Sequence, residues 1–167
     1  MSIANTLRSY LDERAMPYEL VRHPRTMTSS ETAEAAHVSG SLLAKPVVVE
    51  DNDRYMVVVI PASHRLKFTA LHRALGRQCG LATEREIEAL FDDCERGAIP
   101  ALAQAYGLDV LVDDSLLGLQ DVYFEAGDHV ELVHLAGDDF RKLMRDAAHG
   151  AFAEEMASYG QGRREGH

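Results

Sequence analysis

The sequence predicts an α+β fold, in which helices accompany a mixed or mostly antiparallel β-sheet. The clearest sign is a hairpin: runs rich in Val and Ile over residues 44–50 and 54–60 flank the turn-forming triplet Asp51-Asn52-Asp53. Shorter segments with strand character lie at residues 18–21, 110–112, 122–124 and 130–135. These strand segments come in groups typical of antiparallel pairing, with segments of helical spacing inserted between the groups, which is the pattern of an α+β fold.

Helices are expected where apolar residues recur every three or four positions. Capping-box spacing marks the start of two of them, at Thr28 with Glu31 and at Thr83 with Glu86. Gly76 marks the end of another, because glycine accepts the left-handed conformation that closes many helices. The expected helices cover residues 2–15, 28–37, 67–75, 83–91 and 138–148.

Length and composition indicate one domain. The 167 residues are 46% hydrophobic, so they can form one core, expected over residues 1–159 and followed by a disordered tail over residues 160–167. The longest apolar run has only the length of a strand, and the N-terminus lacks the pattern of a secretory signal. The two cysteines, Cys79 and Cys94, are too few for a disulfide framework or a zinc site. The expected location is therefore the cytoplasm, with no membrane contact.

The charge of the chain restricts its partners. A formal net charge of −10 argues against strong autonomous binding to a nucleic-acid backbone, which requires clustered Lys and Arg. Three small basic groups are present, at Arg22, His23 and Arg25, at His64, Arg65 and Lys67, and at His72, Arg73 and Arg77. An RNA substrate is therefore expected to bind weakly, in a salt-sensitive manner, or with the help of a partner.

Common catalytic motifs are missing from the sequence. It has no G-x-S-x-G elbow, no phosphate-binding glycine loop and no dinucleotide fingerprint. Ser63 and His64 are adjacent, which on a strand directs two side chains to opposite faces and is poor geometry for a nucleophile and its base. The histidines show no recognised metal-ligand spacing, either between His64 and His72 or between His129 and His134. Neither a metal nor a cofactor is expected.

Two features remain as candidates for chemistry. Lys45, beside Pro46, stands at the head of the apolar hairpin, where partial burial would hold its ammonium group near a cleft. The second is Gly97-Ala98-Ile99-Pro100, in which glycine permits close approach of the backbone to a ligand and proline stiffens the turn. The same four residues are also compatible with an ordinary loop before a helix over residues 101–106. Asp113 and Asp114, at a strand end, are interpreted as a solvated turn.

Several short motifs occur in an order that resembles a known family. They are Y-E-L-V-R-H-P at residues 18–24, Thr28-Ser29-Ser30, Ala44-Lys45, V-V-I-P-A-S-H-R at residues 58–65, G-A-I-P at residues 97–100, V-D-D at residues 112–114 and V-Y-F-E-A-G at residues 122–127. In this order and spacing the chain resembles the YbaK/ProX-type aminoacyl-tRNA deacylases, relatives of the editing domain of bacterial prolyl-tRNA synthetases. The resemblance extends from about residue 7 to about residue 143.

The resemblance implies a fold, an activity and a site. The implied fold is a barrel-like, mixed β-sheet surrounded by helices, and the implied activity is metal-independent hydrolysis of a mischarged aminoacyl-tRNA, with a small amino acid such as Ala or Cys on tRNA-Pro or a similar tRNA. The expected partners are the acceptor end of the tRNA and an aminoacyl-tRNA synthetase. By position, Lys45 is the expected catalytic residue, and the expected substrate-binding residues are Gly97, Ala98, Ile99, Pro100, His129, Thr28 and Ser29.

Two departures from the family leave the specificity open. Pro46 stands where many relatives have a small polar residue, and it removes a backbone donor beside Lys45. Residues 101–103 replace a glycine-containing continuation of the 97–100 loop. The alternative is a non-catalytic module that uses the same pocket to bind a tRNA or a synthetase. Hydrolysis of another acyl ester is a third hypothesis, since a fold alone does not determine function.

Overall fold

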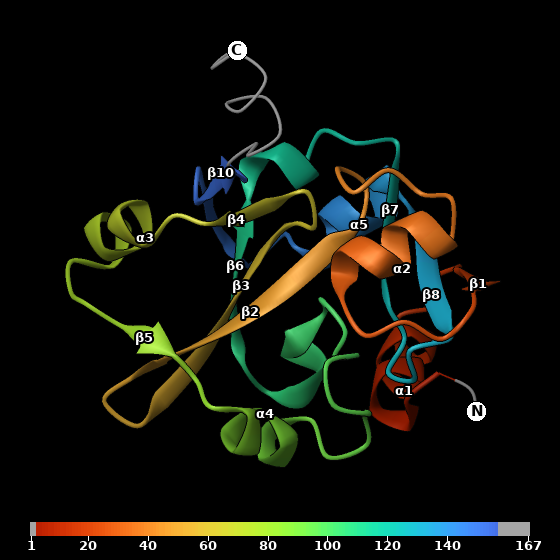
Figure 1. The fold of residues 1–167 in the computed structure, drawn as a ribbon, viewed down its shortest axis with the longest axis horizontal. Coiled ribbons are helices and arrows are strands. Elements are labelled where there is room, and N and C mark those ends of the chain that lie inside the picture. The colour runs from red at the N-terminus through yellow and green to blue at the C-terminus, as the bar shows by residue number, and fades with distance from the viewer. Residues whose placement is uncertain (1–2, 157–167) are drawn as a thin grey trace, which may run out of the picture.

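The computed structural model describes residues 3–156, and the predicted tail over residues 160–167 lies outside them (Figure 1). The α-helices are α1 (Asn5–Glu13), α2 (Ser29–Ala35), α3 (Phe68–Leu75), α4 (Glu84–Leu90) and α5 (Gly137–Leu143), with 3₁₀ turns η1 (Ala103–Tyr106) and η2 (Asp114–Leu116). The strands are β1 (Glu19–Arg22), β2 (Ala44–Asp51), β3 (Arg54–Pro61), β4 (His64–Leu66), β5 (Gly80–Leu81), β6 (Asp109–Asp113), β7 (Asp121–Glu125), β8 (Glu131–Ala136), β9 (Ala148–Gly150) and β10 (Ala153–Glu155).

The strands form three ladders, in the orders β5-β2-β3-β6-β9, β1-β8-β7 and β10-β4. Five of the seven pairings are antiparallel, while β3–β6 and β6–β9 are parallel. A parallel bridge between Leu43 and Tyr123 connects the start of β2 to β7. The predicted α+β class and the mixed, mostly antiparallel sheet are confirmed, although the ladders of residues 3–156 stay separate instead of closing into a full barrel.

The central hairpin is buried on both faces, which explains its continuous apolar sequence. From β3, Val57 and Val59 enter the larger core cluster, whereas Met56, Val58 and Ile60 enter a second cluster on the opposite face. In Figure 1, β2 and β3 cross the centre of the molecule, with α3 and β5 on one side and α2, β7 and β8 on the other. The start of β2 therefore lies where the two parts of the molecule meet.

Local signals mark three of the helix ends, as the sequence predicts. Thr83 and Glu86 form a complete capping box, and Gly76 closes α3 with a φ of 73°. Thr28 also caps its helix by accepting from the Glu31 amide. The helix predicted over residues 138–148 ends earlier, at Leu143, because Ala148–Gly150 pairs with β6 as strand β9.

Asp113 is buried, so its interpretation as part of a solvated turn is wrong, whereas Asp114 is exposed as expected. One carboxylate oxygen of Asp113 accepts from the backbone amides of Phe152 and Ala153, at 2.7 and 3.0 Å. The other accepts from the amide and the hydroxyl of Ser115. This one side chain therefore joins β6 to the segment that leads into β10.

Replacing Asp113 with asparagine should lower the free energy of unfolding by about 1–3 kcal/mol, because the amide group cannot accept at both ends and leaves buried donors without partners. Urea unfolding followed by circular dichroism measures the loss. The matched control is Asp114→Asn, which removes only an exposed pair with His149 and should cost about 0–1 kcal/mol. Equal losses in the two variants would contradict the anchoring role of Asp113.

Candidate functional site

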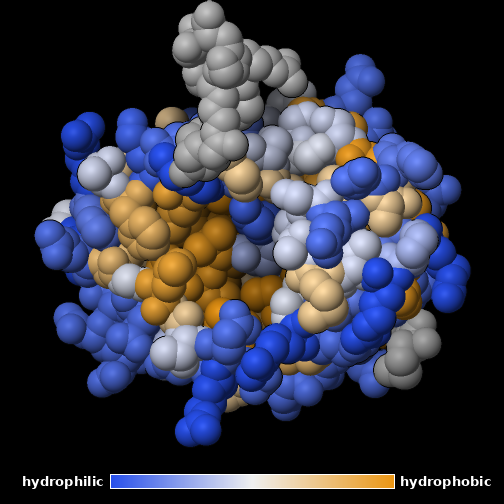
Figure 2. Space-filling model, in the orientation of Figure 1, coloured by the Kyte–Doolittle hydropathy of each residue, from blue (hydrophilic) through white to orange (hydrophobic). Residues whose placement is uncertain are grey.

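Lys45 stands in the wall of an open groove with a volume of about 680 Å³. Figure 2 shows this region as a hydrophobic hollow between β2 and α3. The groove has an apolar floor and a charged rim, formed by Lys45 and Val47 of β2, Ile60 of β3, Arg65 and Leu66 of β4, Lys67, Phe68 and Thr69 at the start of α3, Leu81 of β5 and Glu154 of β10. It suits a ligand with one apolar part and one anionic or polar part.

The ammonium group of Lys45 is held by the backbone. Its Nζ donates to the carbonyl oxygen of His64 over 2.9 Å, and the half-buried position lowers the pKa of Lys45 through loss of hydration. Among residues 3–156, no carboxylate lies within ion-pair distance of this ammonium. Because an ammonium carries three donors, Lys45 can still donate to an oxygen of a bound ligand.

Ser63 and His64 meet beside this anchor, contrary to the geometry expected from their adjacency. The Ser63 hydroxyl lies 2.8 Å from His64 Nδ1. The contact forms because Ser63 belongs to the turn between β3 and β4, where the alternation of strand side chains does not apply. Neither side chain lines the groove.

The 97–100 loop is built around a required glycine. Gly97 is exposed and has a φ of 82°, while Ala98, Ile99 and Pro100 are buried. A Cβ atom at Gly97 would lie 3.3 Å from Cε1 of the His129 ring and 3.9 Å from the Met27 carbonyl oxygen. The loop thus contacts His129 and approaches the segment that leads into α2.

The remaining predicted site residues are largely engaged in structure. His129 is 1% exposed, and its Nε2 makes a short hydrogen bond with the carbonyl of Arg96, the residue before the loop glycine. The Thr28 hydroxyl caps α2, and Ser29 is the first residue of that helix. His129 is therefore too deeply buried to touch a substrate directly, and it would act on one through the 97–100 loop that it supports.

The predicted site residues thus fall into two groups. Ile99 of the loop belongs to the core cluster that contains Ala44 of β2. Lys45 follows Ala44 along the strand, so its side chain points to the other face of β2, where the groove lies. The structure brings the 97–100 loop together with His129 and the start of α2, but it places Lys45 on the opposite face of the strand.

Sequence reasoning missed a buried group of three side chains, His23, Glu125 and His129, which we call the Glu125 cluster. The Glu125 oxygens lie 3.8 Å from His23 Nε2 and 3.9 Å from His129 Nδ1. Burial raises the pKa of Glu125 to about 8, and the neighbouring Asp128 carboxylate adds to the rise. The only local signal in the sequence is a glutamate directly after an apolar strand.

Within residues 3–156, no three His, Cys, Asp or Glu side chains are arranged to hold a metal ion. In the same part of the chain, no helix has the length and apolar character needed to cross a membrane.

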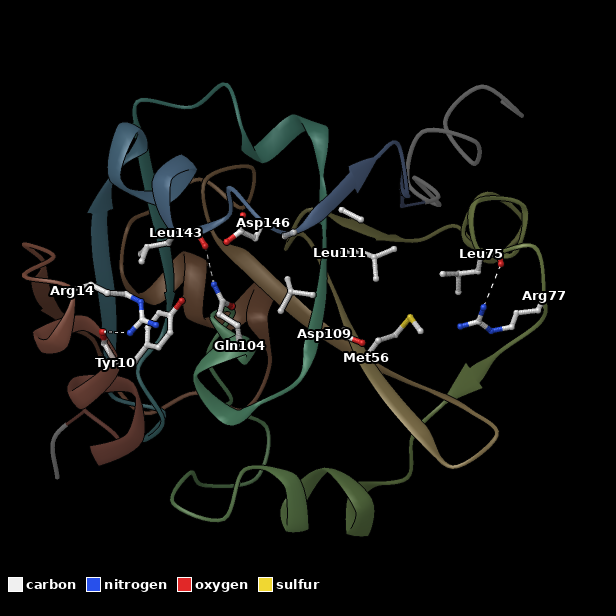
Figure 3. A pocket seen from close by; sticks show the side chains of 13 residues that line it. Tyr10, Arg14, Met56, Leu75, Arg77, Gln104, Asp109, Leu111, Leu143 and Asp146 are labelled. Atoms are coloured by element: carbon white, nitrogen blue, oxygen red, sulfur yellow. Dashed lines mark hydrogen bonds between the residues drawn. The ribbon is translucent and has the colours of Figure 1, made fainter.

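A second cavity, of about 550 Å³, lies away from the predicted site (Figure 3). Near one end, the Arg14 guanidinium stacks on the Tyr10 ring at 3.6 Å, and the Gln104 amide donates to the Leu143 carbonyl. None of the residues predicted for the site lines this cavity, so we assign the candidate site to the Lys45 groove.

Comparison with known proteins identifies the family. The sequence matches the aminoacyl-tRNA editing domain over residues 23–143. The hypothetical protein APE2540 has a similar fold, with a TM-score of 0.79, 24% identity, and coverage of 90% of this chain and 100% of that chain. A protein proposed to be a trans-editing enzyme for prolyl-tRNA synthetase gives a TM-score of 0.77 at 22% identity, covering 92% and 97%. None of the curated protein sequences matches. Because the family match spans most of the chain and agrees with the resemblance in the motifs, this protein belongs to the YbaK family of aminoacyl-tRNA editing domains.

Proposed function

We propose that this chain is a metal-independent deacylase that acts in trans on mischarged aminoacyl-tRNA. The observation that carries the proposal is the half-buried ammonium of Lys45, held by the His64 carbonyl in the wall of an open groove. The family match indicates the substrate class, and the groove offers a surface on which the aminoacyl end of such a substrate could bind.

The chemistry requires little from the side chains. The aminoacyl ester is already activated, so water can attack the carbonyl carbon while the bond to the ribose oxygen breaks. The ribose hydroxyl regains a proton, and the amino acid leaves as a carboxylate. An ammonium at the carbonyl oxygen stabilises the negative charge that develops there, which is the role proposed for Lys45.

The groove offers separate places for the parts of an acceptor end. Its apolar floor and the Phe68 ring can take the terminal base by stacking. Arg65 and Lys67 at the rim can contact phosphate oxygens, although Arg65 also pairs with Glu154 at 3.1 Å. With so few cations and a net charge of −10, binding should be weak and sensitive to salt, and a synthetase partner would compensate.

The 97–100 loop is proposed to place the aminoacyl group from the other face of β2. Lys45 is the second residue of that strand, so a substrate that crosses the beginning of β2 would meet both faces. The exposed backbone at Gly97 supports this role, because glycine carries no side chain of its own that would cover it. Thr28 and Ser29 lie on the helix that follows Met27, next to the loop.

A matrix of mischarged tRNAs tests the proposed function. We expect hydrolysis of a subset with small amino acids, Ala or Cys on tRNA-Pro being the first candidates, measured as release of labelled amino acid above the uncatalysed rate. Discrimination by one methylene should be modest, about 10–200-fold, because a hydrophobic pocket yields only about 1–3 kcal/mol for it. Binding without turnover across the whole matrix would instead support a non-catalytic tRNA-binding module.

A further inference from the structure

The Glu125 cluster has no role in the chemistry described so far, and its three side chains come from separate segments. His23 follows β1, Glu125 ends β7, and His129 lies in the turn between β7 and β8. All three are buried, with exposed fractions of 6%, 6% and 1%. Within residues 3–156, His23 Nε2, Glu125 Oε1 and His129 Nδ1 have no hydrogen-bond partner at normal distance.

Backbone carbonyls determine which ring nitrogens carry the protons. His23 Nδ1 lies 2.8 Å from the Pro24 carbonyl oxygen, and His129 Nε2 is bonded to the Arg96 carbonyl. A carbonyl oxygen only accepts, so these two nitrogens are the donors. In uncharged rings the other nitrogens, His23 Nε2 and His129 Nδ1, are then bare and face the two oxygens of Glu125.

This arrangement favours a protonated Glu125. A carboxylate would set its lone pairs against two bare nitrogens, whereas a carboxylic acid can donate its O–H to either of them. Asp128, which accepts from the amides of Val130 and Glu131, places a further negative charge nearby. The raised pKa of Glu125 agrees with this geometry.

Among residues 3–156, the other nearby charges act on Asp128 or Glu131 and not on Glu125 itself. The Glu131 carboxylate and the Arg25 guanidinium both interact with Asp128, and Arg22 in turn acts on Glu131. The groups that face Glu125 itself are the two histidines and Asp128. The state of Glu125 is therefore decided locally.

The cluster is connected to the 97–100 loop through His129. The bond to the Arg96 carbonyl is accompanied by a second one, from the Glu95 amide to the Gly127 carbonyl at 2.8 Å. The His129 ring also packs directly against Gly97. A change of tautomer or charge at His129 therefore alters a hydrogen bond that is made directly to the backbone next to the loop, at the Arg96 carbonyl.

We propose that Glu125 is a positioning residue, whose carboxylic acid O–H donates to the bare Nδ1 of His129, keeps the proton of that ring on Nε2, and so holds the Arg96–Gly97 backbone in its active conformation. This inference rests on the proposed function, because it assumes that the loop places the aminoacyl group. When Glu125 loses its proton, the carboxylate requires N–H donors. A His129 tautomer protonated at Nδ1 can donate to that carboxylate, but its bare Nε2 no longer donates to the Arg96 carbonyl. Deacylation should then fall as Glu125 ionises.

The first test measures the protonation and tautomer of the histidine rings directly, by ¹⁵N NMR of histidine-labelled full-length protein. In the wild type, His129 should be neutral with a protonated Nε2 at pH 7, and its signals should shift as the pH passes about 8. Glu125→Gln, which also donates but does not titrate, should remove that shift. A charged His129 ring at pH 7, or an unaltered shift in Glu125→Gln, would overturn the proposal.

The second test is the pH profile of deacylation, after subtraction of uncatalysed hydrolysis. The wild type should lose activity above pH 8, by about tenfold for each pH unit beyond the titration. Glu125→Gln should recover more of the pH 7 activity than Glu125→Ala and should lack the alkaline fall. The matched control, Glu131→Gln, neutralises a buried carboxylate that faces Asp128 instead of the rings, and should keep the fall.

The two hypotheses fail separately in these experiments. If the wild type cleaves no mischarged tRNA, the proposed function is wrong, and the NMR titration still decides the protonation of Glu125. If the wild type cleaves its substrate and Glu125→Gln shows the same alkaline fall, the positioning role is overturned while the deacylase function stands.

Discussion

Replacing Lys45 with methionine should lower the rate of deacylation by about 100-fold or more, the usual cost of removing one donor that stabilises a developing oxyanion. Methionine retains most of the apolar stem but has no charge. The folded state should not suffer, because the substitution removes a poorly hydrated ammonium whose single hydrogen bond within residues 3–156 goes to the His64 carbonyl. Single-turnover hydrolysis at saturating enzyme and urea unfolding measure the two effects.

The matched control is Lys67→Met, which changes an exposed lysine on the rim of the same groove. If Lys67 contacts a phosphate, its loss should raise KM several-fold, less so at high salt, with little change in kcat. The loss at Lys45 should appear in kcat and persist at high salt. Equal, salt-sensitive effects at both positions would mean that Lys45 merely attracts the tRNA, and unchanged hydrolysis in Lys45→Met would exclude it from the reaction.

Features encoded in adjacent residues could be predicted from the sequence. The hairpin of β2 and β3 follows from two Val-rich runs around one polar turn, and the caps at Thr28 and Thr83 follow from hydroxyl and carboxylate groups three positions apart. The half-buried position of Lys45 could be predicted for the same reason, because it depends on the apolar strand in which the lysine lies.

Features that depend on distant segments could not be predicted. Asp113 is buried because the amides of Phe152 and Ala153 reach it from across the fold, and nothing near residue 113 indicates this. Strands of two or three residues, such as β5 and β9, have no periodicity of their own and exist through their pairing. The separation of Lys45 from the 97–100 loop by β2 is likewise a property of the packed sheet.

Replacing Glu125 with glutamine should make the protein more resistant to alkali, which is the largest stability effect expected at the Glu125 cluster. The pKa of Glu125 is raised by burial from an ordinary value of 4.5 to about 8 in the folded protein. Between these values the folded state binds a proton that the unfolded state has released. The stability contributed by the protonated acid is therefore complete below pH 4.5 and is lost as the pH rises through 8.

The size of this loss is about 4 kcal/mol between pH 5 and pH 9, since the folded state holds the extra proton over about three pH units and each of them corresponds to about 1.4 kcal/mol. Urea unfolding at a series of pH values should show a steeper decline for the wild type than for Glu125→Gln. Glu88→Gln, at an exposed glutamate, serves as control and should follow the wild-type curve. Parallel curves for the wild type and Glu125→Gln would mean that Glu125 is already ionised in the folded protein. In that case each of the two histidine rings would have to donate one N–H to the Glu125 carboxylate and the other to the carbonyl of Pro24 or Arg96.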